Sequence, residues 1–215
     1  MESASKLVEM VQARAKGAPE YLCNDAVRRA FAEVCRYSDC WRRSLVFTVD
    51  SVEDTIDDKI RVDLPDTGYE AEIGRIHRVF LELYDSTAAD FDDASEVTAG
   101  TYRMVRGEKL QIEFDNEDLL EADDRLTVDV SLIPLEIGSS ISDIPSGVVQ
   151  LCGSAVVHLA TADLMRMSKR PWTDFDTAQY ERTEGMNALR QILFNAGNGS
   201  TNEAASAPVS GIIEG

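Results

Sequence analysis

The sequence has little of what most enzyme active sites are built from. It contains two histidines and four cysteines in 215 residues, and no two cysteines form a CxxC pair. Metal sites made of thiols and imidazoles need such ligands at short spacing, so we expect no bound metal and no cofactor. A Gly-rich phosphate loop, a GxSxG motif and an HExxH motif are also absent from the sequence. We therefore expect a protein that is not an enzyme.

The few histidines and cysteines have simpler interpretations. His77 lies in the strand-like stretch IGRIHRVF, and we assign it no catalytic role. His158 follows Leu151 by seven positions in an apolar segment, which favours a hydrogen-bonded histidine of the core. Disulfides are rare in reducing compartments, so we interpret the cysteines as small buried or half-buried thiols: Cys23, Cys35, Cys40 and Cys152.

Long apolar runs are absent too. No run of about 18 consecutive apolar residues occurs, as a membrane-spanning helix would require. The first residues, MESASKLVEM, do not have the pattern of a signal peptide. We expect a soluble protein that is made in a cytoplasm and has no membrane partner.

Positive charge is scarce only in the middle of the chain. Residues 44–143 contain 26 Asp and Glu against 8 Lys and Arg, which accounts for the whole net charge of −18. The two flanks together hold 13 residues of each sign. Binding that surrounds a nucleic acid and holds its backbone is disfavoured, because neutralising the phosphates needs clustered Lys and Arg. Because the excess of acidic residues is confined to this segment, general solubility does not explain it.

Clustered carboxylates in the middle segment leave one alternative open. They could hold Ca²⁺ or Mg²⁺, although none has the spacing of an EF-hand loop, and solvated turns are the simpler interpretation. Paired carboxylates for glycoside hydrolysis can come from anywhere in a sequence. The alternative is a metal- or carbohydrate-binding β module on a helical base, and melting with Ca²⁺, Mg²⁺ or a chelator would test its metal version. The clusters are Glu53-Asp54 with Asp57-Asp58, Asp90 with Asp92-Asp93, and Glu121 with Asp123-Asp124.

The segment before the acidic middle has the 3.6-residue periodicity of helices. Residues 3–16 form a first predicted helix that ends before Pro19. A second helix is expected to begin near Asn24 or Asp25, which are good capping residues, and to close at Trp41. Its apolar residues recur at spacings of three and four: Val27, Ala30, Phe31, Val34 and Cys35.

From Ser44 onward the periodicity changes to that of strands. Short stretches such as SLVFTVDSV and RLTVDVSLIPL alternate apolar and polar residues and are separated by acidic turns. The stretch RMVRGEKLQIEF predicts a β-hairpin that turns at Arg106-Gly107-Glu108. We expect five to seven strands, and their connections are too short for βαβ units, which indicates a mostly antiparallel sheet.

After the acidic middle the helical pattern returns, with a distinctive corner. A third helix is expected to start at SDIP, with Asp143 as its cap, and to need cover on several sides because it is apolar nearly all round. Pro171 then breaks the helix, and Thr173 or Asp174 can cap the next one. Trp172 is expected to pack into the corner between these two helices, or simply to be a buried residue of the core. The final helix is predicted to bury Phe175, Ala178, Met186, Leu189, Ile192 and Leu193.

Together these patterns predict an α+β fold. We expect a four-helix bundle with a mostly antiparallel β domain inserted between the second and third helices. The predicted parts are N-terminal helices (1–43), an acidic β-rich insert (44–143), C-terminal helices (144–196) and an extended tail (197–215). The tail is small and polar, yet it ends with Val209, Ile212 and Ile213, which suit a contact that orders only on assembly.

The order of the helical motifs resembles a known family. A DAVRRAFAEVCRYSDCWR helix, a β-rich middle, a helix that starts at IP, a KRPWTD corner and an amphipathic closing helix are similar to the head-to-tail adaptor (connector) proteins of tailed bacteriophages. The residues of the first block that carry the likeness are Ala26, Arg29, Ala30, Phe31, Cys35, Trp41 and Arg42. Those of the second block are Ile144, Pro145, Pro171, Trp172, Thr173, Ala178, Tyr180 and Glu181.

This resemblance implies a virion structural protein at the head–tail junction, synthesised in the host cytoplasm. Its partners would be the portal protein, copies of itself in a ring that is commonly twelve-fold, and a downstream tail or nozzle protein. Genomic DNA would pass through the ring without specific binding, and an acidic lumen would repel its phosphates. Val209, Ile212 and Ile213 would contact the portal or a neighbouring subunit. Trp41, Pro171, Trp172 and Thr173 would shape the helix corners.

Overall fold

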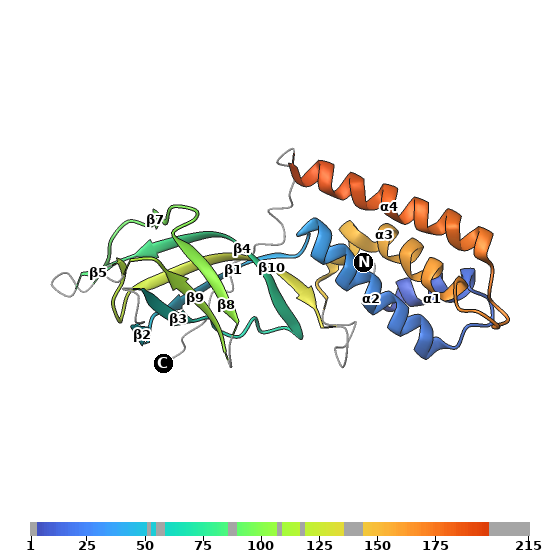
Figure 1. Cartoon of the computed structure of the whole chain (residues 1–215), viewed down its shortest axis with the longest axis horizontal. Coiled ribbons are helices and arrows are strands. Elements are labelled where there is room, and N and C mark those ends of the chain that lie inside the picture. Colours follow the sequence, from blue (N-terminus) through green and yellow to red (C-terminus); the bar gives the residue numbers. More distant parts are fainter. Residues whose placement is uncertain are drawn as a thin grey trace. The chain divides into compact units, whose positions relative to one another are not determined.

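The computed structural model describes residues 4–50, 53–54, 59–85, 90–106, 109–116, 119–135 and 144–197 (Figure 1). This part of the chain contains four α-helices and ten β-strands, so the predicted α+β class is confirmed. It divides into two compact units. The helical unit takes its described residues from Met1–Arg42, Tyr69–Gly74 and Leu132–Gly215, and the β unit takes them from Arg43–Gly68 and Arg75–Ser131.

The helical unit is organised around its third helix. The helices are α1 (Ala4–Arg14), α2 (Glu20–Ser38), α3 (Ser146–Met165) and α4 (Phe175–Gly197). Helix α3 contacts each of the other three, which explains how a helix that is apolar nearly all round can be stable. By length and composition α3 would also pass as a membrane span, with a mean hydropathy of 1.4, but 72% of that window is buried inside the protein. This burial is what a central core helix requires.

The start of α2 differs from the expectation. The helix begins at Glu20, with Pro19 in the N-cap position at φ −61°, rather than near Asn24 or Asp25. Proline is favourable here because its fixed φ suits a helix start and its missing N–H would have no helical partner. The Asn24 side chain does not cap the helix, because its amide donates to the Glu20 carbonyl at 3.1 Å, one turn back.

The packed faces of α1 and α2 follow the expected spacing. Helix α1 buries Leu7, Val8 and Val11, and the apolar stripe predicted for α2 is buried along its length. Helix α2 ends at Ser38 and is capped by Asp39, a left-handed residue whose N–H donates to the Cys35 carbonyl at 3.0 Å. This bond satisfies one of the carbonyls that the last turn leaves open.

Helices α3 and α4 match the expectation in part. Helix α3 begins after Pro145, which occupies the N-cap position, whereas Asp143 lies outside the described residues. Helix α4 buries Ala178, Leu189 and Ile192. Phe175 and Leu193, expected on the same face, are exposed at 61% and 43%. That part of the predicted buried face was wrong.

The strands form two four-stranded sheets and a two-stranded ribbon within the described residues. One sheet has the order β1 (Arg42–Thr48), β10 (Arg125–Pro134), β4 (Ala71–Glu82), β7 (Ser95–Glu96). The other has the order β2 (Glu53–Asp54), β3 (Ile60–Asp63), β9 (Leu110–Phe114), β8 (Tyr102–Arg106). The ribbon pairs β5 (Tyr84–Asp85) with β6 (Asp90–Phe91).

Five strand pairs agree with the predicted antiparallel arrangement. The pairs β2–β3, β3–β9, β8–β9, β4–β7 and β5–β6 are all antiparallel. Ten strands exceed the expected five to seven because β2, β5, β6 and β7 are only two residues long, too short for an alternating pattern. The β8–β9 hairpin pairs Tyr102 with Phe114 and Arg106 with Leu110, and the predicted turn residues Gly107 and Glu108 lie outside the described residues.

The core of the β unit comes from alternating positions on these strands. Ile60 and Val62 of β3, with Ile112 and Phe114 of β9, are at most 3% exposed. Alternation places the residues between them on the opposite face of the sheet, where Arg61 and Glu113 lie. The other sheet buries Leu45, Val79, Leu81, Leu126, Val128 and Val130, and Val49 just after β1 is buried as well.

Candidate functional site

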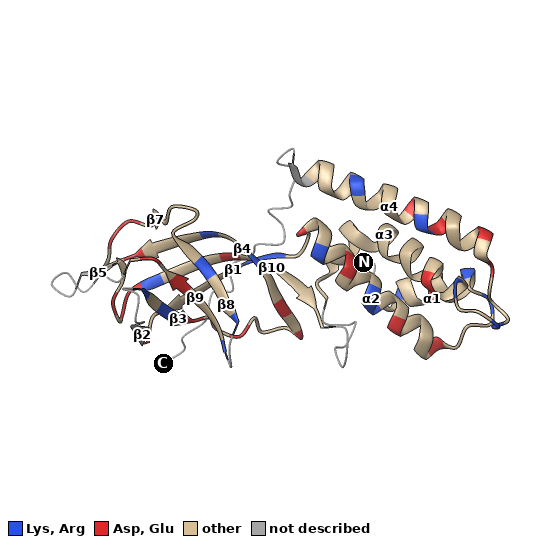
Figure 2. Ribbon diagram, viewed as in Figure 1, with Lys and Arg blue, Asp and Glu red and all other residues tan. Residues whose placement is uncertain are grey.

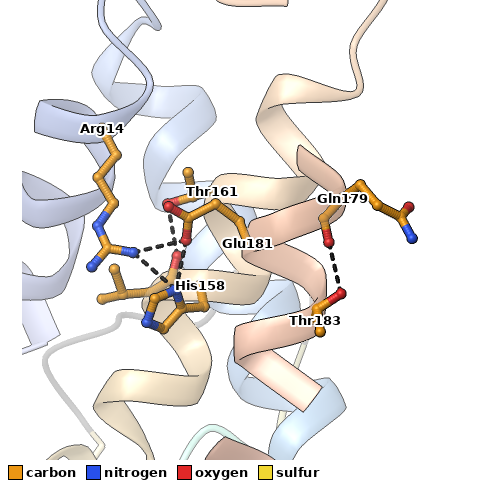
Figure 3. Close-up of polar contacts among 7 residues, drawn as sticks. Arg14, His158, Thr161, Gln179, Glu181 and Thr183 are labelled. Carbon is orange, nitrogen blue, oxygen red and sulfur yellow. Dashed lines mark hydrogen bonds and ion pairs between the residues drawn. The ribbon is translucent and has the colours of Figure 1, made fainter. Parts of the chain in front are cut away.

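A polar cluster joins three helices of the helical unit (Figure 3). Glu181 of α4 places one carboxylate oxygen 2.8 Å from Arg14 Nη1 of α1 and 2.6 Å from His158 Nδ1 of α3. Arg14 Nη1 also lies 3.0 Å from the same His158 nitrogen. Glu181 is 7% exposed, so its charge is compensated by these partners rather than by water. The expectation of a hydrogen-bonded His158 is confirmed, although the side chain is only half-buried.

This cluster has the geometry of a structural clamp. The nearby Thr161 hydroxyl donates to the Val157 carbonyl, one turn back on α3, at 2.7 Å. Its hydrogen bond therefore does not aim it at the His158–Glu181 pair as a nucleophile would be aimed. The arrangement fixes α1 and α4 on the surface of α3.

A second ion pair connects α4 to α2. Arg182 donates to both carboxylate oxygens of Glu33, at 2.7 and 3.1 Å, which is the strong fork-like geometry of a guanidinium with a carboxylate. The hydrogen bonds that Arg182 donates to Glu33 raise the pKa of Arg182. Asp163 of α3 lies close by, and burial raises its pKa, against the opposing effect of Arg29. Two charged contacts therefore hold α4 in place on its inner side.

The predicted corner between α3 and α4 is built from both candidate caps, in different roles. Asp174 caps α4, because its carboxylate accepts the Thr177 N–H at 3.0 Å and the Thr177 hydroxyl at 2.6 Å. Thr173 instead closes the turn: its hydroxyl accepts the Arg170 N–H at 3.0 Å and donates to the Met167 carbonyl. Lys169 adopts a left-handed φ of 60° in this turn.

The two tryptophans are both buried in the helical unit. Trp172 is 9% exposed, next to the exposed Pro171, and its indole N–H has no hydrogen-bond partner among the described residues. Trp41 is 3% exposed and packs edge-on against Tyr69, with ring centroids 5.3 Å apart. Its carbonyl accepts the Leu132 N–H at 2.7 Å. The other predicted contact residues, Val209, Ile212 and Ile213, lie outside the described residues.

Helix α4 also carries apolar side chains on its outer side, which the sequence analysis had not identified. Phe175, Tyr180 and Phe194 are exposed at 61%, 60% and 69%, and Leu193 is exposed as well. At 100° per residue Tyr180 and Phe194 lie on the side of the helix opposite Ala178, Leu189 and Ile192, and Phe175 and Leu193 lie at the edge of the covered side. We call Phe175, Tyr180, Leu193 and Phe194 the outer face of α4. The sequence signal for these exposed residues is that α4 carries apolar residues outside its buried face as well as on it.

The β unit uses its basic residues internally. Within the described residues, six of its cations form ion pairs with carboxylates of the same unit: Lys59, Arg61, Arg78, Arg103, Lys109 and Arg125. The acidic residues, coloured red in Figure 2, outnumber them. Many of these acidic residues are exposed. Exposed examples are Asp92, Asp93, Glu96, Glu121 and Asp123. The surface of this unit is therefore negatively charged.

One carboxylate of the β unit is buried in an ion-pair ladder. Glu113 is 1% exposed and stands between its cross-strand neighbours Arg61 and Arg103. Its oxygens lie 2.7 Å from Arg61 Nη2 and 2.6 Å from Arg103 Nη2. Hydrogen bonds from Arg61 and then Arg103 lower the pKa of Glu113, although burial opposes them. The ladder stabilises three strands of the sheet.

One member of the carboxylate clusters considered for metal binding, Asp124, is already bonded within the β unit. Asp124 is buried, and its oxygens accept the Tyr84 and Glu121 N–H groups, both at 2.8 Å. Among the residues that the structure describes, no group of three or more His, Cys, Asp or Glu is placed to hold a metal ion. Asp57 and Asp58 lie outside those residues, and of Glu53, Asp54 and Asp90 only the backbone is described.

Three cysteines come together in the helical unit, which no sequence spacing indicated. Cys35 and Cys40 lie at the end of α2 and just after it, and Cys152 lies on α3. Their sulfur atoms are in hydrogen-bonding contact. The separation of 112 positions between Cys40 and Cys152 explains why the cluster could not be found from the sequence.

Comparisons with known proteins include a distant structural likeness. No family model matches the chain. No curated protein matches it either. A chain of a solved structure described as the "Neck of empty GTA particle computed with C6 symmetry" aligns with 86% of this chain and 87% of its own length, at 15% identity and a TM-score of 0.29. A TM-score this low does not establish a shared fold.

Proposed function

We propose that this chain is a phage virion structural protein, a head–tail adaptor that forms a ring under the portal protein. It extends the DNA channel and provides the attachment platform for the tail. The proposal combines the motif resemblance of the helical segments with one structural observation. That observation is the outer face of α4, which exposes aromatic and aliphatic side chains on a helix whose inner side is already anchored by Glu181 and Arg182.

An exposed apolar face of this kind favours a protein–protein contact. Fully burying a side chain of this size contributes about 1.5–3 kcal/mol, so four of them provide a useful contact energy. Tyrosine and phenylalanine are also enriched at interfaces. The helical flanks carry balanced charge, so copies of this unit would not repel one another strongly. The neutral helices, as a bundle, would be the scaffold of the ring.

The acidic β unit fits the passage of DNA in this proposal. Six of its described cations are paired with carboxylates of the same unit, which makes them less available to bind phosphates. Exposed carboxylates at the lumen would repel the duplex at distances within the Debye length, about 8 Å at physiological salt. A ring reconstruction with these carboxylates on its outer wall would remove this part of the proposal and leave the ring itself intact.

The ring proposal is tested by co-expressing the full chain with the portal protein of the same particle. A Tyr180→Arg/Phe194→Arg double variant should fail to form the ring that the wild type forms with portal, as seen by sedimentation and negative-stain imaging. Val46→Arg is the matched control, because Val46 is also exposed, at 61%, but lies on β1. A folded wild-type chain that stays monomeric with and without portal would refute the proposal.

A further inference from the structure

The helical unit contains a cluster of three thiols. Cys152 of α3 donates to Cys40 Sγ at 2.8 Å, and Cys35 Sγ of α2 lies 3.7 Å from Cys40 Sγ. Cys35 and Cys152 are at most 1% exposed, and Cys40, just after α2, is half-buried. All three are free thiols. Of the three residues, Cys40 is thus the most exposed.

We propose that Cys40 and Cys152 form an intramolecular disulfide when the chain meets a peroxide. This inference is independent of the proposed function, because it depends only on the packing of α2 and α3. The sulfur atoms of this pair are closer together than those of Cys40 and Cys35, so a small displacement brings them to bonding distance. The pair also connects two segments that are 112 positions apart in the chain.

The two sulfur atoms have different roles in the proposed oxidation, because their pKa values shift in opposite directions. Hydrogen bonds with Cys152 and then Cys35 lower the pKa of Cys40, while the hydrogen bond with Cys40 and burial raise the pKa of Cys152. Cys40 is therefore the thiolate that attacks, and Cys152 remains a thiol until the second step.

The proposed steps balance as a two-electron oxidation. The Cys40 thiolate attacks one oxygen of hydrogen peroxide, the O–O bond breaks, and hydroxide leaves, which gives a sulfenic acid on Cys40. Cys152 sulfur then attacks the Cys40 sulfur, the S–O bond breaks, and the hydroxyl takes the Cys152 proton and leaves as water. The released hydroxide takes up a proton from solvent. Both sulfurs are oxidised, and one peroxide is reduced to two waters.

Cys35 is the competing partner, and three features disfavour it. Its sulfur is farther from Cys40 than the Cys152 sulfur is. Burial and the hydrogen bond with Cys40 also keep the pKa of Cys35 raised. Moreover, a Cys35–Cys40 bridge would close a loop of only five positions at the end of α2.

A Cys40–Cys152 bridge would stabilise the folded chain. A cross-link lowers the entropy of the unfolded chain more strongly when the loop that it closes is longer, and the loop here includes the whole acidic segment. For a chain of this size we expect the midpoint of thermal unfolding to rise by about 10 °C on oxidation and to return on reduction.

The experiment uses the purified full-length chain, first reduced and then exposed to hydrogen peroxide in slight excess. Remaining thiols are blocked, the chain is digested, and cross-linked peptides are identified by mass spectrometry. The expected result is a Cys40–Cys152 cross-link with the loss of two hydrogen atoms, formed within one chain. This measurement needs no variant, so it remains decisive even if a cysteine substitution prevents folding.

Variants provide the matched comparison. Cys23→Ser and Cys35→Ala should keep both the cross-link and the rise in melting temperature, whereas Cys40→Ser and Cys152→Ala should lose both. The proposal is overturned if the wild type shows only sulfenic or sulfinic acid on Cys40, if Cys35–Cys40 is the main bridge, or if bridges form only between chains.

Discussion

Gly185 allows α4 to pack directly on α3, and replacing it with alanine should destabilise the helical unit. A Cβ at this position would lie 2.7 Å from Leu159 Cδ2, 2.8 Å from Leu159 Cγ and 3.2 Å from the Leu159 backbone nitrogen. Leu159 is fully buried, so its side chain has no solvent to move into. The backbone contact means that a rotamer change alone would not relieve the overlap.

The size of the effect follows from two opposing terms. Alanine gains about 0.8–1 kcal/mol over glycine in a helix interior, whereas overpacking a well-filled core costs about 1–3 kcal/mol. Gly147 of α3 is the matched control, because a Cβ there would meet nothing within 4 Å. Gly147→Ala should stabilise by about 0.4–1 kcal/mol. We therefore expect Gly185→Ala to be less stable than Gly147→Ala by about 1–3 kcal/mol.

The assay is urea unfolding followed by far-UV circular dichroism, which reports on the helices. A double-mutant cycle with Leu159→Ala identifies the contact: that change alone should cost about 2–5 kcal/mol, and the Gly185→Ala/Leu159→Ala variant should lose less than the sum of the two single changes. If Gly185→Ala is as stable as Gly147→Ala, or if the two changes are simply additive, the packing explanation is incorrect.

Three further predictions concern the clamp, the ladder and the tail. Glu181→Gln should destabilise the helical unit by about 1.5–3 kcal/mol, because it removes the charge that Arg14 and His158 bind, whereas the exposed Glu9→Gln should leave the urea midpoint unchanged. The hydrogen bonds from Arg61 and Arg103 lower the folded-state pKa of Glu113, so its contribution to stability is complete above the ordinary Glu pKa and is lost as the pH falls through the lowered value. Urea midpoints measured across the acidic range should show this loss in the wild type and a weaker one in Glu113→Gln; parallel curves would contradict it. Ending the chain at residue 197 should abolish docking to portal while the helical spectrum is kept, and normal docking of the shortened chain would count against a role for Val209, Ile212 and Ile213.

Several features of the fold could be predicted because they depend on neighbouring residues. The buried stripe of α2 follows from its periodicity, and the β8–β9 hairpin follows from two alternating segments on either side of a glycine. The start of α2 was misplaced because Asn24 and Pro19 are both plausible first-turn residues, and the choice between them depends on packing. Local sequence gives the type of an element more reliably than its boundary.

Features that depend on distant residues could not be predicted. Phe175 and Leu193 have the spacing of a buried face, but α4 has one covered side, and Glu181 and Gly185 determine which side that is. The pairing of Glu113 with two arginines depends on strand register across three strands. The meeting of Cys40 and Cys152 likewise depends on how α3 lies against α2.

The burial of Trp41 and Trp172 has a practical value for experiments. The chain has only these two tryptophans, both belong to the helical unit, and both indoles are almost entirely shielded from water. Their fluorescence emission should shift to longer wavelength when the helices open, and it will not respond directly to melting of the strands in the β unit. Intrinsic fluorescence therefore follows the helical unit without any label, and comparing it with the far-UV circular dichroism recorded in the same titration shows whether the two units unfold together.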